Sequence, residues 1–191
     1  TTLADLQQMP FSAATLCIGE SVYKTGNWLE KTFEMPCHYF SHLMGLEQTD
    51  AFIQLLSDIS GRPIPLRLLR ERKRLQDTLL DTHFVLSTEA IGIAQEPDNA
   101  LGFAAALAEA GCRIPIIVTT THSEQLADSA AEKIVIGDHS DLDTHQNELA
   151  CIIGNTHCAE FAEPNIPVLR AGYPCHDRYG NADSRWLGYE G

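Results

Sequence analysis

The sequence predicts an α/β protein built from parallel sheets that are flanked by helices. Short runs rich in Ile and Val recur along the chain, and they are apolar nearly throughout instead of alternating with polar residues. Segments with helical periodicity separate these runs. Strands that are apolar on both faces are typical of parallel sheets covered by helices, and alternating strands and helices indicate crossover connections.

The first half of the chain is predicted to contain two extended segments and four helices. Thr2 and Asp5 have the spacing of a capping pair, Pro36 disfavours a helical predecessor, and Gly61 with Pro63 ends a helix. The predicted elements are a short helix that stops at Pro10, a strand at 14–18, a helix at 20–33, an extended segment at 35–40, and helices at 45–59 and about 65–83. The last of these is polar-faced and is the natural hinge between two halves.

The second half is predicted to contain five strands. Pro97 suits the first position of a helix, and Gly111 follows its last turn. The predicted strands lie at 90–94, 114–118, 133–138, 150–154 and 167–169, with helices at 97–110 and 155–161 and a loop at 119–121.

Composition and charge argue against nucleic acid and a membrane as partners. The chain has 13 Lys and Arg against 26 Asp and Glu, a formal charge of −13, which argues against nucleic acid because phosphate binding requires clustered cations. Six of the cations fall within residues 62–74, which we interpret as a solvated or interdomain helix face. The longest apolar stretch, 101–108, is far shorter than the roughly 20 residues that cross a membrane. No secretory signal is recognisable, so a cytoplasmic location is expected.

The cysteines are predicted to be reduced thiols, because they are dilute and form no Cys-x-x-Cys pair. They lie at positions 17, 37, 112, 151, 158 and 175. A metal site made of His157, Cys158, Cys175 and His176 is disfavoured, since the spacing matches no established ligand pattern.

Nucleotide chemistry also finds little support. The turn after strand 90–94 carries Glu96 and Asp98 and no glycine, whereas a pyrophosphate requires glycines and a helix N-terminus without competing anions. We interpret both acids as partners of the helix dipole. No Gly-x-Ser-x-Gly elbow and no Walker loop is present.

A candidate cleft lies at the carboxyl end of strand 150–154, where open α/β sheets bind ligands. Asn155 and His157 are its first candidates. Alternatively, Asn155 or Thr156 caps the following helix.

Six strings then occur in a fixed order, at 75–84, 93–98, 136–138 with 141–142, 153–157, 167–174 and 188–191. Together they resemble the carboxyl-terminal part of the nitrogenase component-1 family. The resemblance implies Rossmann-like α/β domains, with 1–82 as part of a middle domain that includes the long connecting helix and 83–191 as the carboxyl-terminal domain. It extends the candidate cleft or interface to six residues, which are Asn155, His157, Arg170, Tyr173, Asp177 and Arg178.

Within that family the strings are most similar to a scaffold subunit for iron–molybdenum cofactor assembly. The short path from Val118 to Lys133 favours it over the alternative, the electron-transferring β subunit of the molybdenum–iron protein. An unrelated small-molecule-binding α/β domain is a third hypothesis. The scaffold resemblance implies a NifE-like partner in a heterotetramer, with an iron–sulfur cluster and a cofactor precursor in the full complex. It implies no catalytic, metal-ligating or cofactor-binding residue in this chain, and hence no enzyme activity by itself.

Overall fold

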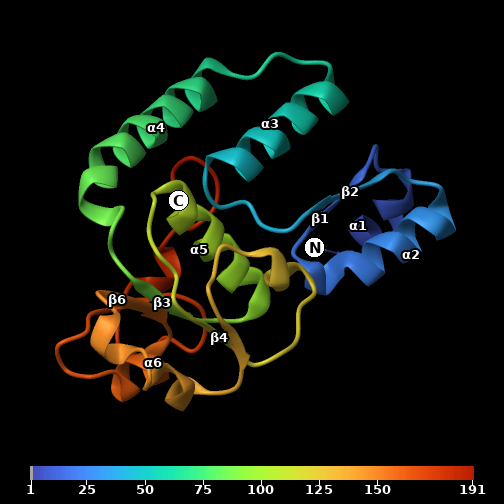
Figure 1. Ribbon diagram of the computed structural model, residues 1–191. Coiled ribbons are helices and arrows are strands. Elements are labelled where there is room, and N and C mark those ends of the chain that lie inside the picture. The colour runs from blue at the N-terminus through green and yellow to red at the C-terminus, as the bar shows by residue number, and fades with distance from the viewer. Residues whose placement is uncertain (1) are drawn as a thin grey trace.

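The computed structural model describes residues 2–191, apart from the side chain of Ala182. Its strands form a two-stranded sheet, β1–β2, and a five-stranded sheet in the order β5-β4-β3-β6-β7 (Figure 1). Every pairing in both sheets is parallel. The predicted α/β class with helix-flanked parallel sheets is therefore confirmed.

The smaller sheet belongs to the amino-terminal part. Its elements are α1 (Leu3–Gln8), β1 (Thr15–Ile18), α2 (Tyr23–Phe33) and β2 (Cys37–Phe40). The predicted capping pair is present, since the Asp5 amide donates to Thr2 Oγ1 while the Thr2 amide donates to the Asp5 carboxylate. The helix predicted at 20–33 begins instead with a 3₁₀ turn at Glu20–Val22, because the chain must turn sharply after β1 before α2 can cover the sheet.

Two long helices follow, α3 (Leu46–Ser60) and α4 (Leu66–Leu86), and they lie above α5 (Pro97–Glu109) in the view of Figure 1. The Arg72 guanidinium donates from Nε and Nη2 to the Asp50 carboxylate of α3, with Nε–Oδ1 at 2.8 Å and Nη2–Oδ2 at 2.7 Å. Tyr189 Oη, from the end of the chain, donates to the same carboxylate at 2.6 Å. Part of the predicted cationic helix face therefore packs against the protein itself.

The larger sheet contains the carboxyl-terminal part. Its elements are β3 (Ile91–Ala94), α5 (Pro97–Glu109), β4 (Ile117–Thr119), β5 (Ile134–Ile136), β6 (Cys151–Gly154), α6 (Thr156–Phe161) and β7 (Val168–Arg170). The strand predicted at 114–118 begins three residues later than expected and includes Thr119, which was predicted to lie in a loop. Ile114 and Ile116 are buried, but Pro115 between them has no amide proton for a ladder.

Two apolar clusters cover the two faces of this sheet. One joins Ile93 and Ile117 to Phe103 and Ala104 of α5, and the other joins Ile152 to Cys158 of α6. Burial on both faces explains why the strands are apolar throughout. No helix among the described residues is long and apolar enough to cross a membrane.

Asp98, one of the two acids after β3, has a role that its position in the sequence did not predict. The Asp98 carboxylate accepts hydrogen bonds from the Glu20 amide at 2.8 Å and from Ser21 Oγ at 2.6 Å. Glu20 in turn accepts hydrogen bonds from Ser123 Oγ and from the amide of Glu124. Together these hydrogen bonds join the turn after β1 to the turns after β3 and β4.

Asp98→Ala is expected to lower the free energy of unfolding by about 1–2 kcal/mol, because it removes two hydrogen bonds to a charged group. Urea denaturation followed by circular dichroism measures the loss. Asp128→Ala is the control, since Asp128 is an exposed acid of a nearby turn and is expected to change stability by less than about 0.5 kcal/mol. Equal effects of the two variants would contradict the proposed link between the turns.

Candidate functional site

The six predicted site residues lie at the carboxyl ends of β6 and β7 and in the loop that follows β7. In the structure, Asn155 hydrogen-bonds to the loop after β7, and Arg170 pairs with Asp177 of the same loop. His157, Tyr173 and Arg178 instead face solvent, with Tyr173 91% exposed. The set thus divides into three residues whose side chains hold the loop and three whose side chains point outward, His157 on α6 and Tyr173 and Arg178 on the loop.

Asn155 is the N-cap of α6, so the capping alternative is confirmed. Its Oδ1 accepts a hydrogen bond from the amide of Cys158 at 3.0 Å, which satisfies an otherwise unpaired donor of the first turn. Its Nδ2 donates to the carbonyl oxygen of Tyr173 at 3.2 Å. One side chain therefore both starts the helix and holds the loop after β7.

Thr156 and Asp177 make the second connection between α6 and this loop. The Thr156 amide donates to the carbonyl of Pro174, and Thr156 Oγ1 accepts from the amide of His176, each at 3.0 Å. The same hydroxyl donates to Asp177 Oδ1 at 2.5 Å. Asp177 Oδ2 accepts from Nε and Nη2 of Arg170 at 3.0 and 2.8 Å. The loop is consequently held from both α6 and β7.

The hydrogen bond from Thr156, followed by those from Arg170, lowers the pKa of Asp177 to about 2. An unfolded aspartate titrates near 3.9, so the folded protein binds this proton less tightly than the unfolded chain does. The contribution of the ionised carboxylate to stability is therefore complete above about pH 4 and is lost as the pH falls toward 2.

Asp177→Asn tests this sign. The protein and the variant are expected to differ in urea midpoint by a constant amount above about pH 5, and the difference is expected to shrink between pH 4 and pH 2. Parallel denaturation series over that range measure it. A difference that grows on acidification would contradict the assignment of Asp177 as the ionised partner of Arg170.

Gln95 is a site residue that sequence reasoning missed. This buried side chain, at the end of β3, donates from Nε2 to the carbonyl oxygen of Ala171 at 2.7 Å. Gly172 follows with φ +75°, and a Cβ there would lie 2.2 Å from Gln95 Oε1. Gln95 is a polar residue directly after an apolar strand, and this position could have marked it as a candidate. From the sequence we interpret only the acidic residues that follow it, Glu96 and Asp98.

The residues of this region do not fit an iron–sulfur cluster, which requires converging thiolates. Cys158 lies on the buried face of α6, where burial raises its pKa to about 11, whereas the adjacent His157 is exposed to solvent. Within the described part of the chain, no three or more His, Cys, Asp or Glu side chains are placed to hold a metal ion.

Two clefts lie away from the predicted residues. One, of about 720 Å³, lies between β2, α3 and α5 and is lined by Tyr39, His42, Glu47 and Glu109 among others. A second, of about 520 Å³, lies at the carboxyl ends of β1, β3 and β4 and includes Glu96. Glu109 accepts hydrogen bonds from the amides of Leu46 and Glu47, so this acid caps α3 from another helix.

Comparison with known proteins identifies the family. The model of the nitrogenase component 1 type oxidoreductases matches residues 1–191, the entire chain. The chain belongs to this family. The resemblance drawn from the six strings is thereby confirmed.

Relatives within the family match the chain along its full length. Proteins described as nitrogenase iron-molybdenum cofactor biosynthesis protein NifN are 38% identical over 192 residues in a Nostoc species and 37% identical over 202 residues in Rippkaea orientalis. Each match covers all of this chain and 43% or 44% of the relative, in its carboxyl-terminal part. The chain thus spans less than half the length of these relatives.

A solved structure described as nitrogenase Cp1 at pH 6.5 shares the fold, with a TM-score of 0.89 and 27% sequence identity. The match covers 99% of this chain and 44% of the solved one. In the structure, the string at 153–157 contains the end of β6 and the cap of α6.

Proposed function

We propose that the chain is the carboxyl-terminal region of a scaffold subunit on which the iron–molybdenum cofactor of nitrogenase is assembled. The observation that carries the proposal is the similarity to proteins named NifN, which is 30–38% and extends over nearly the whole chain in every case. A fold alone does not specify function, but this similarity is greater than that to the solved nitrogenase at 27%.

In this proposal the work of the chain is positional. It pairs with a NifE-like subunit in a heterotetramer in the cytoplasm, and the cofactor precursor is cargo held mainly by that partner. The full complex also carries an iron–sulfur cluster, whose ligands lie outside this chain. The division into a middle-domain part at 1–82 and a last domain at 83–191 is supported by the two separate sheets, with α4 continuing to Leu86 across the boundary.

The loop after β7 is the part that we assign to partner contact. Its backbone is held by the bonds from Asn155 and Thr156, while Tyr173 and Tyr179 are almost completely exposed. Tyrosine contributes disproportionately to protein interfaces, and a side chain presented by a preorganised loop loses little conformational entropy on binding.

Co-purification tests the proposal. The subunit that contains this chain, co-expressed with a tagged NifE-like subunit, is expected to be retained with it. The double variant Tyr173→Ala and Tyr179→Ala is expected to bind roughly tenfold more weakly. Tyr173→Phe keeps the ring and is expected to bind normally, as is Phe11→Ala, which removes an exposed aromatic residue from the amino-terminal part.

The possible outcomes separate two errors. Absence of retention for the unaltered subunit contradicts the scaffold proposal itself. Normal retention of the double tyrosine variant contradicts only the placement of the interface on this loop.

Metal content gives a further prediction. The chain purified by itself is expected to contain less than one iron atom per molecule, because no three His, Cys, Asp or Glu side chains of the described residues surround one point. Iron analysis and absorbance after desalting measure this. A stable iron–sulfur absorbance band would contradict the assignment of the cluster ligands to another part of the complex.

The alternative, a β subunit of the molybdenum–iron protein, is supported by the likeness to the solved nitrogenase. Between β4 and β5 the chain has one 3₁₀ turn, at Gln125–Asp128, so this connection is short. Substrate reduction by the purified complex discriminates the two functions. The scaffold proposal expects none, and the β-subunit alternative expects turnover when a reductase is supplied.

A further inference from the structure

Two cysteines of the amino-terminal sheet lie in contact. Cys17 Sγ of β1 and Cys37 Sγ of β2 are 3.4 Å apart. The parallel register pairs Thr15 with Cys37 and Cys17 with Tyr39, so the two cysteines are diagonal neighbours on adjacent strands. Alternation of side chains places them on the same face of the sheet.

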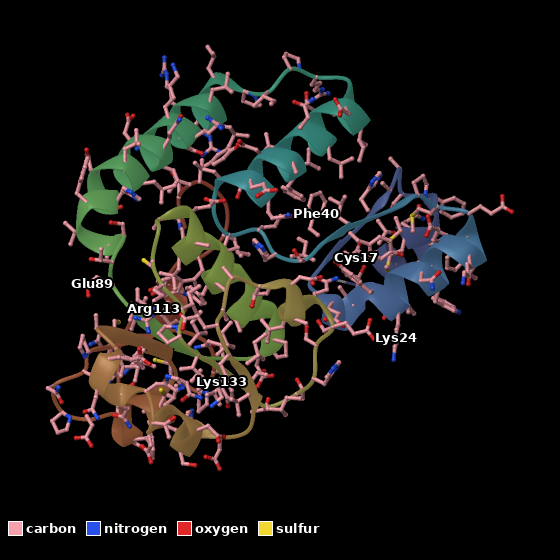
Figure 2. All side chains as sticks on the ribbon, viewed as in Figure 1. Cys17, Lys24, Phe40, Glu89, Arg113 and Lys133 are labelled. Carbon is pink, nitrogen blue, oxygen red and sulfur yellow. The ribbon has the colours of Figure 1, made fainter. Side chains whose placement is uncertain are left out.

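Helix α2 keeps both sulfur atoms in this position. A Cβ atom at Gly26 of α2 would lie 2.3 Å from Cys17 Sγ and 2.8 Å from Cys37 Sγ, so only glycine lets the helix come this close. Figure 2 shows Cys17 at the strand pair beside α2, from which Lys24 projects. The helix therefore restricts the two thiols to one small space between itself and the sheet.

We propose that Cys17 and Cys37 are a redox modification site, at which a low-molecular-weight disulfide such as glutathione disulfide oxidises the two thiols to a reversible intrachain disulfide. Closing the bond requires the sulfurs to move from 3.4 Å to about 2.05 Å. Side-chain rotation must be accompanied by a small approach of the two strands, because diagonal neighbours in a sheet are roughly 7–8 Å apart and a disulfide spans less than about 7 Å between Cα atoms. All six cysteines are free thiols in the structure.

The reaction proceeds by two exchange steps. Cys37, which is partly exposed, loses its proton and attacks one sulfur of glutathione disulfide, which forms a mixed disulfide and releases one glutathione thiolate. Cys17 then loses its proton and attacks Cys37 Sγ, which releases the second glutathione. Two cysteine thiols are oxidised, one glutathione disulfide is reduced, and the two protons end on the two glutathione thiols.

Burial divides the roles of the two cysteines. Cys17 is only 4% exposed, so an external disulfide reaches Cys37 first. Burial, together with the contact with Cys37, raises the pKa of Cys17 to about 11. At neutral pH the second step is therefore expected to be slower than it would be for a thiol of ordinary pKa at the same distance, because only the thiolate attacks.

A disulfide here would change the sheet as well as the thiols. A two-stranded sheet has little stability by itself, and this one depends on its packing against α2. The bond would join β1 to β2 directly and close the loop that contains α2, which restricts the unfolded chain.

Peptide mapping tests the proposal without ambiguity. Trypsin cuts after Lys24 and Lys31 but not between Arg62 and Pro63, so Cys17 lies in the peptide that ends at Lys24 and Cys37 lies in residues 32–67. The purified protein is incubated with glutathione disulfide, its remaining thiols are alkylated, and the digest is analysed by mass spectrometry before and after reduction. The expected product is one species that joins these two peptides and separates on reduction.

Variants and an unfolded sample provide the controls. Cys37→Ser is expected to abolish the joined species, whereas Cys151→Ser, which removes another partly buried cysteine, is expected to retain it. In 8 M urea the yield is expected to fall at least severalfold, because proximity is lost and other pairings compete. Circular dichroism checks that both variants are folded.

Two results would overturn the proposal, and both are measured on the unaltered protein. One is the absence of the joined species under native conditions. The other is an equal or higher yield in urea, which would mean that the folded geometry does not direct the pairing.

Discussion

Ile93→Ala is expected to lower the free energy of unfolding by about 2–5 kcal/mol, the range for deleting a large buried aliphatic side chain. Ile93 is 0% exposed and lies on β3, the central strand of the five-stranded sheet. Its side chain belongs to the cluster with Phe103 and Ala104 of α5. The sheet is held by hydrogen bonds between strands, and the helix by hydrogen bonds along its own backbone. They therefore cannot collapse fully into the resulting cavity.

Urea denaturation followed by circular dichroism measures this effect, with the slope of the transition checked for two-state behaviour. The control is Leu169→Ala on the edge strand β7, where the side chain is already 40% exposed. We expect a loss below about 1.5 kcal/mol there, because most of the cavity penalty is absent. A loss at Ile93 no larger than that at Leu169 would contradict the placement of β3 at the centre of the core.

Gly154→Ala is expected to have the second largest effect, a loss of about 1–3 kcal/mol from overpacking. A Cβ at this position would lie 2.6 Å from both Cβ and Sγ of Cys158. The sulfur can rotate away, but the Cys158 Cβ is attached to the backbone of α6, so the helix itself must shift. That shift would disturb the bonds from Asn155 and Thr156 to the loop after β7.

Amide hydrogen exchange separates this local mechanism from a general loss of stability. In Gly154→Ala the amides of Cys158 and His176 are expected to exchange faster, because the first is bonded to Asn155 and the second to Thr156. Gly61→Ala is the control, because an alanine at Gly61 is strained only by its backbone, with φ +63°, and nothing lies within 4 Å of its Cβ position. Unchanged protection of both amides in Gly154→Ala would contradict the coupling of α6 to the loop.

Local sequence patterns predicted the order and type of nearly all the elements. Capping at Thr2, the stop at Gly61 and the start at Pro97 depend on residues within one turn of each helix, and the structure confirms all three. Strand limits were less predictable. Residues 114–116 are as apolar as β4 itself, and only the pairing with β3 and β5 shows which of them join the ladder.

The candidate site was only partly predictable for the same reason. Asn155 as a cap follows from its position before a helix, and the structure bears it out. The three outward residues, His157, Tyr173 and Arg178, remain predictions for a partner surface. Gln95 and Ala171 are 76 residues apart, and no pattern in either segment indicates that they meet.

The sequence by itself determined which segments are apolar on both sides, which residues begin and end the helices, and to which family the chain is similar. Those properties depend on neighbours along the chain. Only the tertiary structure decided that Asp98 binds the turn at Glu20, that Asp50 joins Arg72 to Tyr189, and that Cys17 meets Cys37. Hydrogen bonds and sulfur contacts act over about 3 Å, so their partners are chosen by strand register and helix packing, which arise only when the whole chain folds.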